Sequence, residues 1–220
     1  MTLTPSAFAV IIGFAAFSEC GIAQDKIRLV DIKSADPTIV VDLRYAGTNN
    51  VAGRRLYPKD MPAFIRPEIV PRLRAAQKFL RSFDYRLKIW DAYRPEAAQK
   101  SLWRAIHNSD YVADPEVGPG SMHTWGIAVD CTLVDTFNRP VAMPTDFDNF
   151  TPAAMSRYSG TDRAVRNHLR LLQVAMAASG FYGFRSEWWH FTVKDWPKFL
   201  PPEEAKRVAQ LFGSPTKGVP

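Results

Sequence analysis

Two short segments carry side chains that could bind a metal ion and activate water. The first, S-M-H-T-W-G-I-A-V-D at 121–130, places His123 seven residues before Asp130. The second, E-W-W-H, places Glu187 three residues before His190. Two imidazoles and one carboxylate leave a fourth zinc position open for water, as in catalytic zinc sites. We therefore predict one Zn²⁺ per chain, with His123, Asp130 and His190 as its ligands.

Glu187 would then be free to act as a general base. Zinc lowers the pKa of a bound water to about 7. A nearby carboxylate could accept the proton of this water and later donate it to a leaving amine. Arg94 is the candidate donor to the developing oxyanion, a role worth about 3 to 4 kcal/mol. Taken alone, Arg94 could equally be a surface arginine that caps a helix.

The strands that must position these residues follow from apolar and β-branched runs. His123 and Asp130 are an odd number of residues apart, so a straight strand would point them to opposite faces. A bend at Gly126, or a loop position for His123, is therefore required. Strands are predicted at Thr38–Tyr45, Tyr85–Tyr93 and Ile127–Val134, and Phe181–Val193 is predicted as a turn and an aromatic strand that holds Glu187 and His190.

Four segments show the apolar spacing or the boundary residues of helices. Thr161 is predicted to cap the strongest of them and Gly180 to stop it, while Pro95 is predicted as the first residue of another. Two stretches rich in Pro, Gly, Asp or Asn, 109–120 and 135–160, are predicted as loops. The predicted helices are Glu68–Phe83, Glu96–Asn108, Ala164–Ala178 and Glu203–Phe212.

Length and composition predict one domain behind an export signal. The chain has 220 residues, 46% of them hydrophobic, enough for one sizeable core. Ala7–Phe17 is an uninterrupted apolar run, too short for a stable membrane anchor but typical of a signal peptide. We expect cleavage before Gln24, so that 1–23 is the signal and 24–220 the catalytic domain. The alternatives are an uncleaved anchor, a buried N-terminal helix or a lipid-modified Cys20.

Charge and cysteine content exclude other classes. The net charge of +6 suits anionic surfaces, but the Lys and Arg residues are scattered without interleaved aromatics, so nucleic-acid binding is not expected. If Cys20 leaves with the signal, only Cys131 remains and no internal disulfide can form. Cys131 should point away from Asp130 into the core. His107 and His168 have no neighbouring ligand pattern and are interpreted as ordinary helical histidines.

The chain resembles the D-alanyl-D-alanine dipeptidases, a branch of the zinc DD-peptidases. The signature S-x-H-x-x-G-x-A-x-D is matched at every fixed position within 121–130, and E-x-W-H is matched at 187–190. Segments typical of the dipeptidase branch are D-L-R-Y-A at 42–46, L-Y-P at 56–58 and W-D-A-Y-R-P at 90–95. The resemblance implies a single α+β domain with a small mixed or antiparallel sheet, flanking helices and a zinc cleft. It also implies zinc ligation by His123, Asp130 and His190, with Glu187 as base and acid and Arg94 as transition-state donor.

The resemblance further implies that Tyr45, Ser121 and Asp148 hold the free amino group of a dipeptide. A carboxylate paired with the substrate ammonium would favour free dipeptides, because an N-acylated peptide would leave that buried carboxylate unpaired. Asp146 competes with Asp148 for this assignment.

The expected reaction is zinc-dependent hydrolysis of D-Ala-D-Ala to two D-alanines. The partner is thus a small D-amino-acid dipeptide, with no membrane insertion after signal removal; the oligomeric state stays open. Export to the periplasm favours turnover or salvage of dipeptides derived from peptidoglycan. The alternatives are a D,D- or L,D-carboxypeptidase that trims longer wall peptides and a noncatalytic wall-binding module.

Overall fold

A five-stranded mixed sheet organises the structure, a computed structural model that describes residues 27–206. The predicted signal at 1–23 lies outside the described residues. The strand order is β2-β4-β5-β7-β6, in which β2 and β4 are parallel and the other neighbours are antiparallel. The strands are β2 (Val40–Val41), β4 (Tyr85–Asp91), β5 (Ala128–Asp135), β6 (Phe181–Gly183) and β7 (His190–Val193), and β1 (Val30–Asp31) pairs separately with β3 (Phe64–Ile65).

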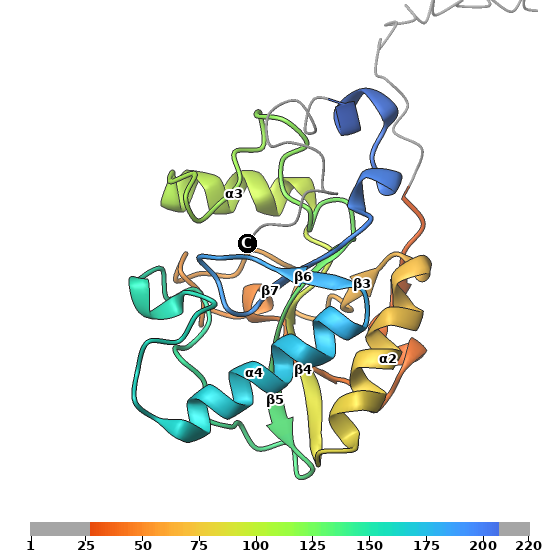
Figure 1. Cartoon of the computed structure of the whole chain (residues 1–220). Coiled ribbons are helices and arrows are strands. Elements are labelled where there is room, and N and C mark those ends of the chain that lie inside the picture. The colour runs from red at the N-terminus through yellow and green to blue at the C-terminus, as the bar shows by residue number, and fades with distance from the viewer. Residues whose placement is uncertain (1–26, 207–220) are drawn as a thin grey trace, which may run out of the picture.

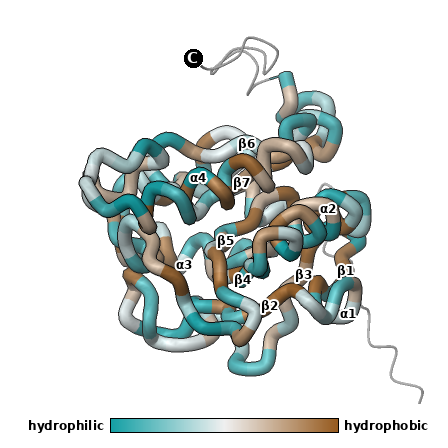
Figure 2. The backbone as a smooth tube through the Cα atoms, turned by 60° about the horizontal axis from the view of Figure 1, so that its bottom comes forward, coloured by the Kyte–Doolittle hydropathy of each residue, from teal (hydrophilic) through white to brown (hydrophobic). Residues whose placement is uncertain are grey.

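The centre of the sheet is the β4–β5 pair. β5 is buried along its length except at its last residue, as its continuous apolar run predicts. Leu87 pairs with Leu133 and Ile89 with Cys131, and these side chains belong to the hydrophobic core. The hydropathy-coloured backbone shows brown segments along the inner strands and teal on the outer turns (Figure 2). Cys131 therefore packs in the core, as predicted, and its burial raises the pKa of the thiol well above its usual value.

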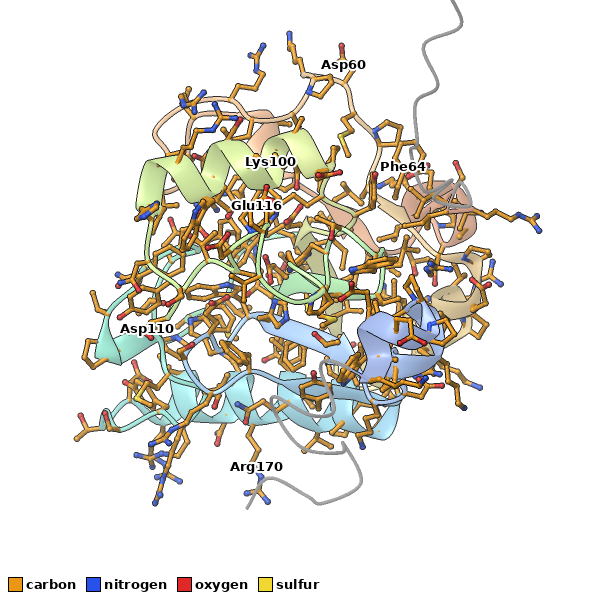
Figure 3. All side chains as sticks on the ribbon, turned by 90° about the horizontal axis from the view of Figure 1, so that it is seen from above. Asp60, Phe64, Lys100, Asp110, Glu116 and Arg170 are labelled. Atoms are coloured by element: carbon orange, nitrogen blue, oxygen red, sulfur yellow. The ribbon has the colours of Figure 1, made fainter. Side chains whose placement is uncertain are left out.

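Helices lie on both sides of this sheet. α2 (Val70–Arg81) and α4 (Arg163–Ala178) pack against each other and against the sheet, while α3 (Glu96–Ile106) lies on the opposite side (Figures 1 and 3). The remaining short helices are α1 (Ile32–Ala35), η1 (Arg44–Ala46), η2 (Pro67–Ile69), η3 (Pro152–Ala154) and η4 (Trp196–Phe199). The predicted α+β fold class is confirmed. Within residues 27–206, no helix has the length and apolar character needed to cross a membrane.

The predicted strand at Thr38–Tyr45 is wrong over most of its length. Only Val40–Val41 is a strand, because Asp42 N–H donates the last bond to the Ile89 carbonyl before the chain turns into η1. Tyr45 therefore belongs to a 3₁₀ turn and is buried there. The β-branched composition predicted that this segment contains a strand, but it did not predict where pairing with the neighbouring strand ends.

The predicted helices are present with shifted boundaries. Asp162, not Thr161, caps α4, because its carboxylate accepts hydrogen bonds from Ala164 N and Val165 N. Pro95 is the N-cap of α3 rather than its first helical residue. The segment predicted from Glu68 begins as η2 before α2. Of the predicted helix Glu203–Phe212, residues up to 206 are helical and the rest lies outside the described residues.

Two turns deliver the candidate ligands. The chain bends at Gly126, whose φ is +65° and whose N–H donates to the His123 carbonyl. This is the bend that the odd spacing of His123 and Asp130 requires. β6 and β7 form a hairpin whose connection carries Glu187, so the predicted aromatic strand holds His190 but not Glu187.

Replacing Gly126 with Ala should destabilise the chain more than replacing a glycine of similar backbone conformation. A Cβ at Gly126 would lie 2.9 Å from Leu29 Cδ2, whereas a Cβ at Gly53 (φ +61°) would meet nothing within 4 Å. We expect Gly53→Ala to cost about 1 to 2 kcal/mol for the left-handed conformation, and Gly126→Ala about 1 kcal/mol more for the contact. Urea unfolding of the metal-free chain measures both, and equal losses would contradict the expectation.

Candidate active site

Three candidate ligand atoms converge at one end of the β5–β7 pair. His190 is the direct cross-strand partner of Asp130, and the Gly126 turn brings His123 to the same place. His123 Nε2 lies 3.1 Å from His190 Nδ1, and Asp130 Oδ1 lies 3.3 and 3.0 Å from these two nitrogens. Two ligands of a tetrahedral zinc, each bound at about 2.0 to 2.1 Å, are themselves about 3.3 Å apart. The triangle therefore has the size that zinc requires.

The outward ring nitrogens of both histidines have partners. His123 Nδ1–H donates to the Ala92 carbonyl at 2.8 Å, and His190 Nε2 lies 3.0 Å from Thr192 Oγ1. Such hydrogen bonds fix the tautomer of a metal-bound histidine. With protons on these outward nitrogens, two nitrogen lone pairs face a carboxylate oxygen with no proton between them. Three acceptors that face one another need a cation, which is how the residues fit a zinc ion.

The ligand set lies almost out of water. Burial by itself raises the pKa of Asp130, but His123 and His190 outweigh it and lower that pKa well below its usual range. Burial disfavours the charged form of His123, yet Asp130 overcomes this effect and raises the pKa of the imidazole. The charged forms of Asp130 and His123 thus stabilise each other. A bound metal cation would supply the positive charge next to Asp130 without a proton on the histidine.

Arg94 is directed at this cluster from the end of β4. Its Nε and Nη2 donate to Asp91 Oδ2 at 3.0 and 2.7 Å, and its Nη1 donates to Gln99 Oε1 at 2.8 Å. Nη2 also lies 3.7 Å from Asp130 Oδ2. Because Arg94 is only 6% exposed and is held by this network, it is not the surface helix-capping arginine of the alternative interpretation.

Glu187 is buried beside the cluster, at 8% exposure. Loss of water raises its pKa to about 8, and the nearby His190 opposes this rise. Cations lower the pKa of neighbouring carboxylates, so metal loading and ionisation of Glu187 favour each other. A carboxylate whose pKa lies near neutrality suits both the acceptance and the later donation of a proton.

A second buried acidic group lies beside Tyr45. Asp148 is 9% exposed and accepts hydrogen bonds from the Tyr45 hydroxyl at 3.1 Å and from Val51 N at 3.0 Å. The Arg94 guanidinium lies 4.9 Å above the Tyr45 ring. Burial raises the pKa of Asp148 to about 7 despite these donors. This carboxylate therefore lacks a full counter-charge in the structure.

Two other candidates fall in different surroundings. Asp146, the competitor of Asp148, is exposed and pairs with Arg44 at 2.9 Å. Ser121 is buried at the start of the metal turn, where its Oγ accepts a hydrogen bond from His123 N at 3.3 Å. The structure thus gathers every predicted site residue except the competitor Asp146 into one buried region; the individual roles stay predictions.

Sequence reasoning missed the groups that hold Arg94. Asp91 is completely buried and also accepts a 2.5 Å hydrogen bond from the Tyr57 hydroxyl. A β-bulge between Ile89 and Asp91 brings Asp91 opposite Asp130. An acid three residues before an arginine, within W-D-A-Y-R-P, was the available signal. No local pattern indicated that Gln99 would join this network.

Comparisons with known proteins show the family of this chain. The profile of the peptidase M15 family, described as D-Ala-D-Ala dipeptidase, matches residues 25–208. A D-alanyl-D-alanine dipeptidase of Escherichia coli K12 is 32% identical over 170 residues, covering 77% of this chain and 86% of the relative. Another from Enterococcus faecalis is 29% identical over 175 residues, covering 71% and 86%. A crystal structure of the D,D-pentapeptidase VanY, an E175A mutant with Zn(II), is a distant match, with a TM-score of 0.39 at 15% identity over 69% of this chain and 81% of its own.

The family match, together with a His/Asp/His triad that fits zinc, indicates a metallopeptidase with a zinc cofactor. The chain belongs to the peptidase M15 family, in the D-Ala-D-Ala dipeptidase group. The predicted resemblance, enzyme class and cofactor are thereby confirmed.

Zinc binding should depend on the triad histidines and not on other partly buried histidines. We expect about one zinc per wild-type chain after dialysis, and less than roughly a tenth of that in His190→Ala. His168→Ala is the matched control, because His168 also bonds a side chain and a carbonyl, Tyr85 and Ala142, but lies outside the triad. Elemental analysis gives the metal content. Equal zinc in both variants would contradict the assignment.

Asp148 should make stability fall as pH rises. Its pKa is about 7 when folded against 3.8 for the ordinary carboxyl, so between these values the unfolded chain releases a proton that the folded chain keeps. Folding is therefore penalised progressively from about pH 4 to pH 7. Asp148→Asn removes this penalty, and its stability advantage should grow over that range to at most about 4 kcal/mol. Urea unfolding of the metal-free chains at several pH values measures the difference; a constant or shrinking difference would contradict it.

Proposed function

We propose that this protein hydrolyses the free dipeptide D-Ala-D-Ala to two molecules of D-alanine. The observation that carries this proposal is the buried Tyr45–Asp148 pair, joined to the ligand triad through Arg94. A substrate ammonium would supply the positive charge that Asp148 lacks. The family match and the named relatives support a dipeptide of this kind.

Contacts connect Asp148 to the ligand triad through Tyr45 and Arg94. Asp148 and Tyr45 lie on the β2–β4 side of the sheet, and the triad lies on the neighbouring β5–β7 pair. A substrate whose ammonium binds Asp148 would therefore direct its peptide bond past Arg94 towards the triad. The site residues are almost entirely buried, which favours a small substrate over a long wall peptide.

Each group then has one chemical task. Zinc would supply a water of lowered pKa and polarise the peptide carbonyl. Glu187 takes the proton of the attacking water and delivers it to the departing amino group. The two Arg94 N–H groups that are not used by Asp91 and Gln99 are available to the developing oxyanion. The proton that leaves the water thus returns on the leaving amine, which balances the hydrolysis.

The alternative is a D,D- or L,D-carboxypeptidase that acts on longer wall peptides. Such a substrate has no free ammonium next to the cleaved bond, and it would place an acylated nitrogen against Asp148. Burying that carboxylate without a counter-charge costs more than any hydrogen bond would return. The noncatalytic wall-binding module is not retained, because the enzyme class is confirmed.

We further propose export to the periplasm and a role in turnover or salvage of dipeptides released from peptidoglycan. The apolar run Ala7–Phe17 and the scarcity of charge in the first 23 residues support export. A dipeptidase outside the cytoplasm would meet released wall fragments rather than the cytoplasmic precursor pool.

Release of D-alanine by the zinc-loaded chain tests the reaction. We expect wild-type protein to cleave D-Ala-D-Ala and to cleave its N-acetylated form at least roughly 100-fold less efficiently, because the acetyl group removes the ammonium. Glu187→Ala should lower kcat by about 1,000-fold. Asp148→Asn should lower kcat/KM for the free dipeptide by roughly 100-fold. It should also reduce the ratio of kcat/KM for the free dipeptide to kcat/KM for the acetylated one.

Asp146→Asn is the matched control, because this neighbouring carboxylate is exposed and pairs with Arg44. Its kcat/KM should stay within about two-fold of wild type. Preferred cleavage of the acetylated dipeptide or of a wall pentapeptide would replace this proposal with the carboxypeptidase alternative.

A further inference from the structure

We propose that Gln99 is a positioning residue for the hydrolysis, holding Arg94 and the loop 109–120 with the two ends of one amide. This inference rests on the proposed function. Gln99 is 1% exposed on the face of α3 that turns towards the sheet. Its Oε1 accepts the 2.8 Å bond from Arg94 Nη1, and its Nε2 donates to the Ala113 carbonyl at 2.6 Å.

Asp91 alone leaves the guanidinium able to pivot. Both of its contacts with Arg94 fall on one oxygen, Asp91 Oδ2, and both use the Nε–Nη2 edge. The Gln99 contact is on Nη1, at the other end of the planar group. Two anchors at different ends fix the guanidinium plane, so its remaining N–H groups keep their direction towards the triad.

The second end of the amide fixes a loop that leads into the metal site. The loop 109–120 is followed immediately by the turn that carries His123, whose carbonyl accepts a hydrogen bond from Arg94 N at 3.1 Å. Next to Gln99 on α3, Lys100 lies 3.7 Å from Glu116 of the same loop, and both labels appear on the α3 side in Figure 3. Of these residues only Gln99 is buried, since Lys100 is half-buried and Glu116 is exposed.

A neutral amide of this length satisfies both partners. Arg94 presents a donor and Ala113 an acceptor, so the residue between them must accept at one end and donate at the other. A methionine of similar size would remove both hydrogen bonds and leave an N–H of the buried Arg94 without this acceptor. A glutamate would keep an acceptor for Arg94 but would place a second acceptor against the Ala113 carbonyl.

Three variants separate positioning from general stability. In Gln99→Met we expect kcat for D-Ala-D-Ala to fall about 10- to 100-fold while KM stays within about three-fold, because Arg94 acts in the transition state. Gln99→Glu should keep kcat within about five-fold of wild type, while its thermal midpoint falls through loss of the Ala113 bond. Affinity for a phosphinate analogue of the dipeptide, whose tetrahedral centre mimics the transition state, should follow kcat across the variants.

Gln77→Met is the matched control. Gln77 is also 1% exposed and its amide also accepts at one end and donates at the other, although both partners are backbone groups: it donates to the Thr38 carbonyl and accepts from Leu87 N, each at 2.8 Å. It lies between α2 and β4, outside the network that holds Arg94. This variant should lower the thermal midpoint about as much as Gln99→Met does and leave kcat unchanged.

An NMR readout tests the same inference without turnover. When a guanidinium is held at both ends, its Nη–H signals stay separate because rotation about the Cζ–N bonds is hindered. We expect separate Arg94 signals in wild type and Gln77→Met, and averaged signals in Gln99→Met. An inactive wild type with this signal pattern would reject the proposed function but not the positioning of Arg94.

Four results would overturn the inference. They are averaged Arg94 signals in the wild type, kcat of Gln99→Met within two-fold of an active wild type, an equal loss of kcat in Gln77→Met, and a loss in Gln99→Glu as large as in Gln99→Met. If Gln99→Met does not fold, Gln99→Glu carries the test, because retained kcat with a lowered midpoint supports positioning and a loss of kcat rejects it.

Discussion

The arrangement of this protein depends on three acceptor atoms that face one another in a buried place. His123, Asp130 and His190 lie 3.0 to 3.3 Å apart, with hydrogen-bond partners on the outward ring nitrogens. Only a proton or a metal cation can satisfy such a set, and its dimensions fit zinc. The antiparallel pairing of β5 with β7 places His190 opposite Asp130, and the bend at Gly126 brings His123 to them.

Around this centre, charge is balanced in a chain rather than in isolated pairs. Asp91 neutralises Arg94, Arg94 lies next to Asp130 and over Tyr45, and Tyr45 donates to Asp148. The last group of this series is Asp148, a carboxylate whose pKa is raised by burial to about 7. Since buried charges are tolerated only when paired, the unpaired end is the natural place for a cationic group of the substrate. Zinc at one end and an ammonium at the other would define the length of the substrate between them.

Much of this was predictable from short motifs because the chemistry is concentrated in them. The spacing of His123, Asp130, Glu187 and His190 indicated the metal set and required a bend near Gly126. Strong apolar patterns likewise predicted the central strands and α4. Predictions that relied on element ends were less accurate. The strand proposed for Thr38–Tyr45 shrank to Val40–Val41, and Asp162 replaced Thr161 as a cap, because pairing partners and local hydrogen bonds decide where elements end.

By itself, the sequence determined the residue types of the site, the class of reaction and the α+β character of the domain, since these follow from side-chain chemistry and local periodicity. The choice between Asp146 and Asp148, which the sequence left in competition, was decided by the tertiary structure, because only the fold places one carboxylate beside Tyr45 and the other beside Arg44 at the surface. The tertiary structure also decided that Asp91 and Gln99 share Arg94. The Asp91 contact had a local signal in its spacing of three residues from Arg94, but the Gln99 contact depends on where α3 lies relative to the end of β4, which no local pattern encodes.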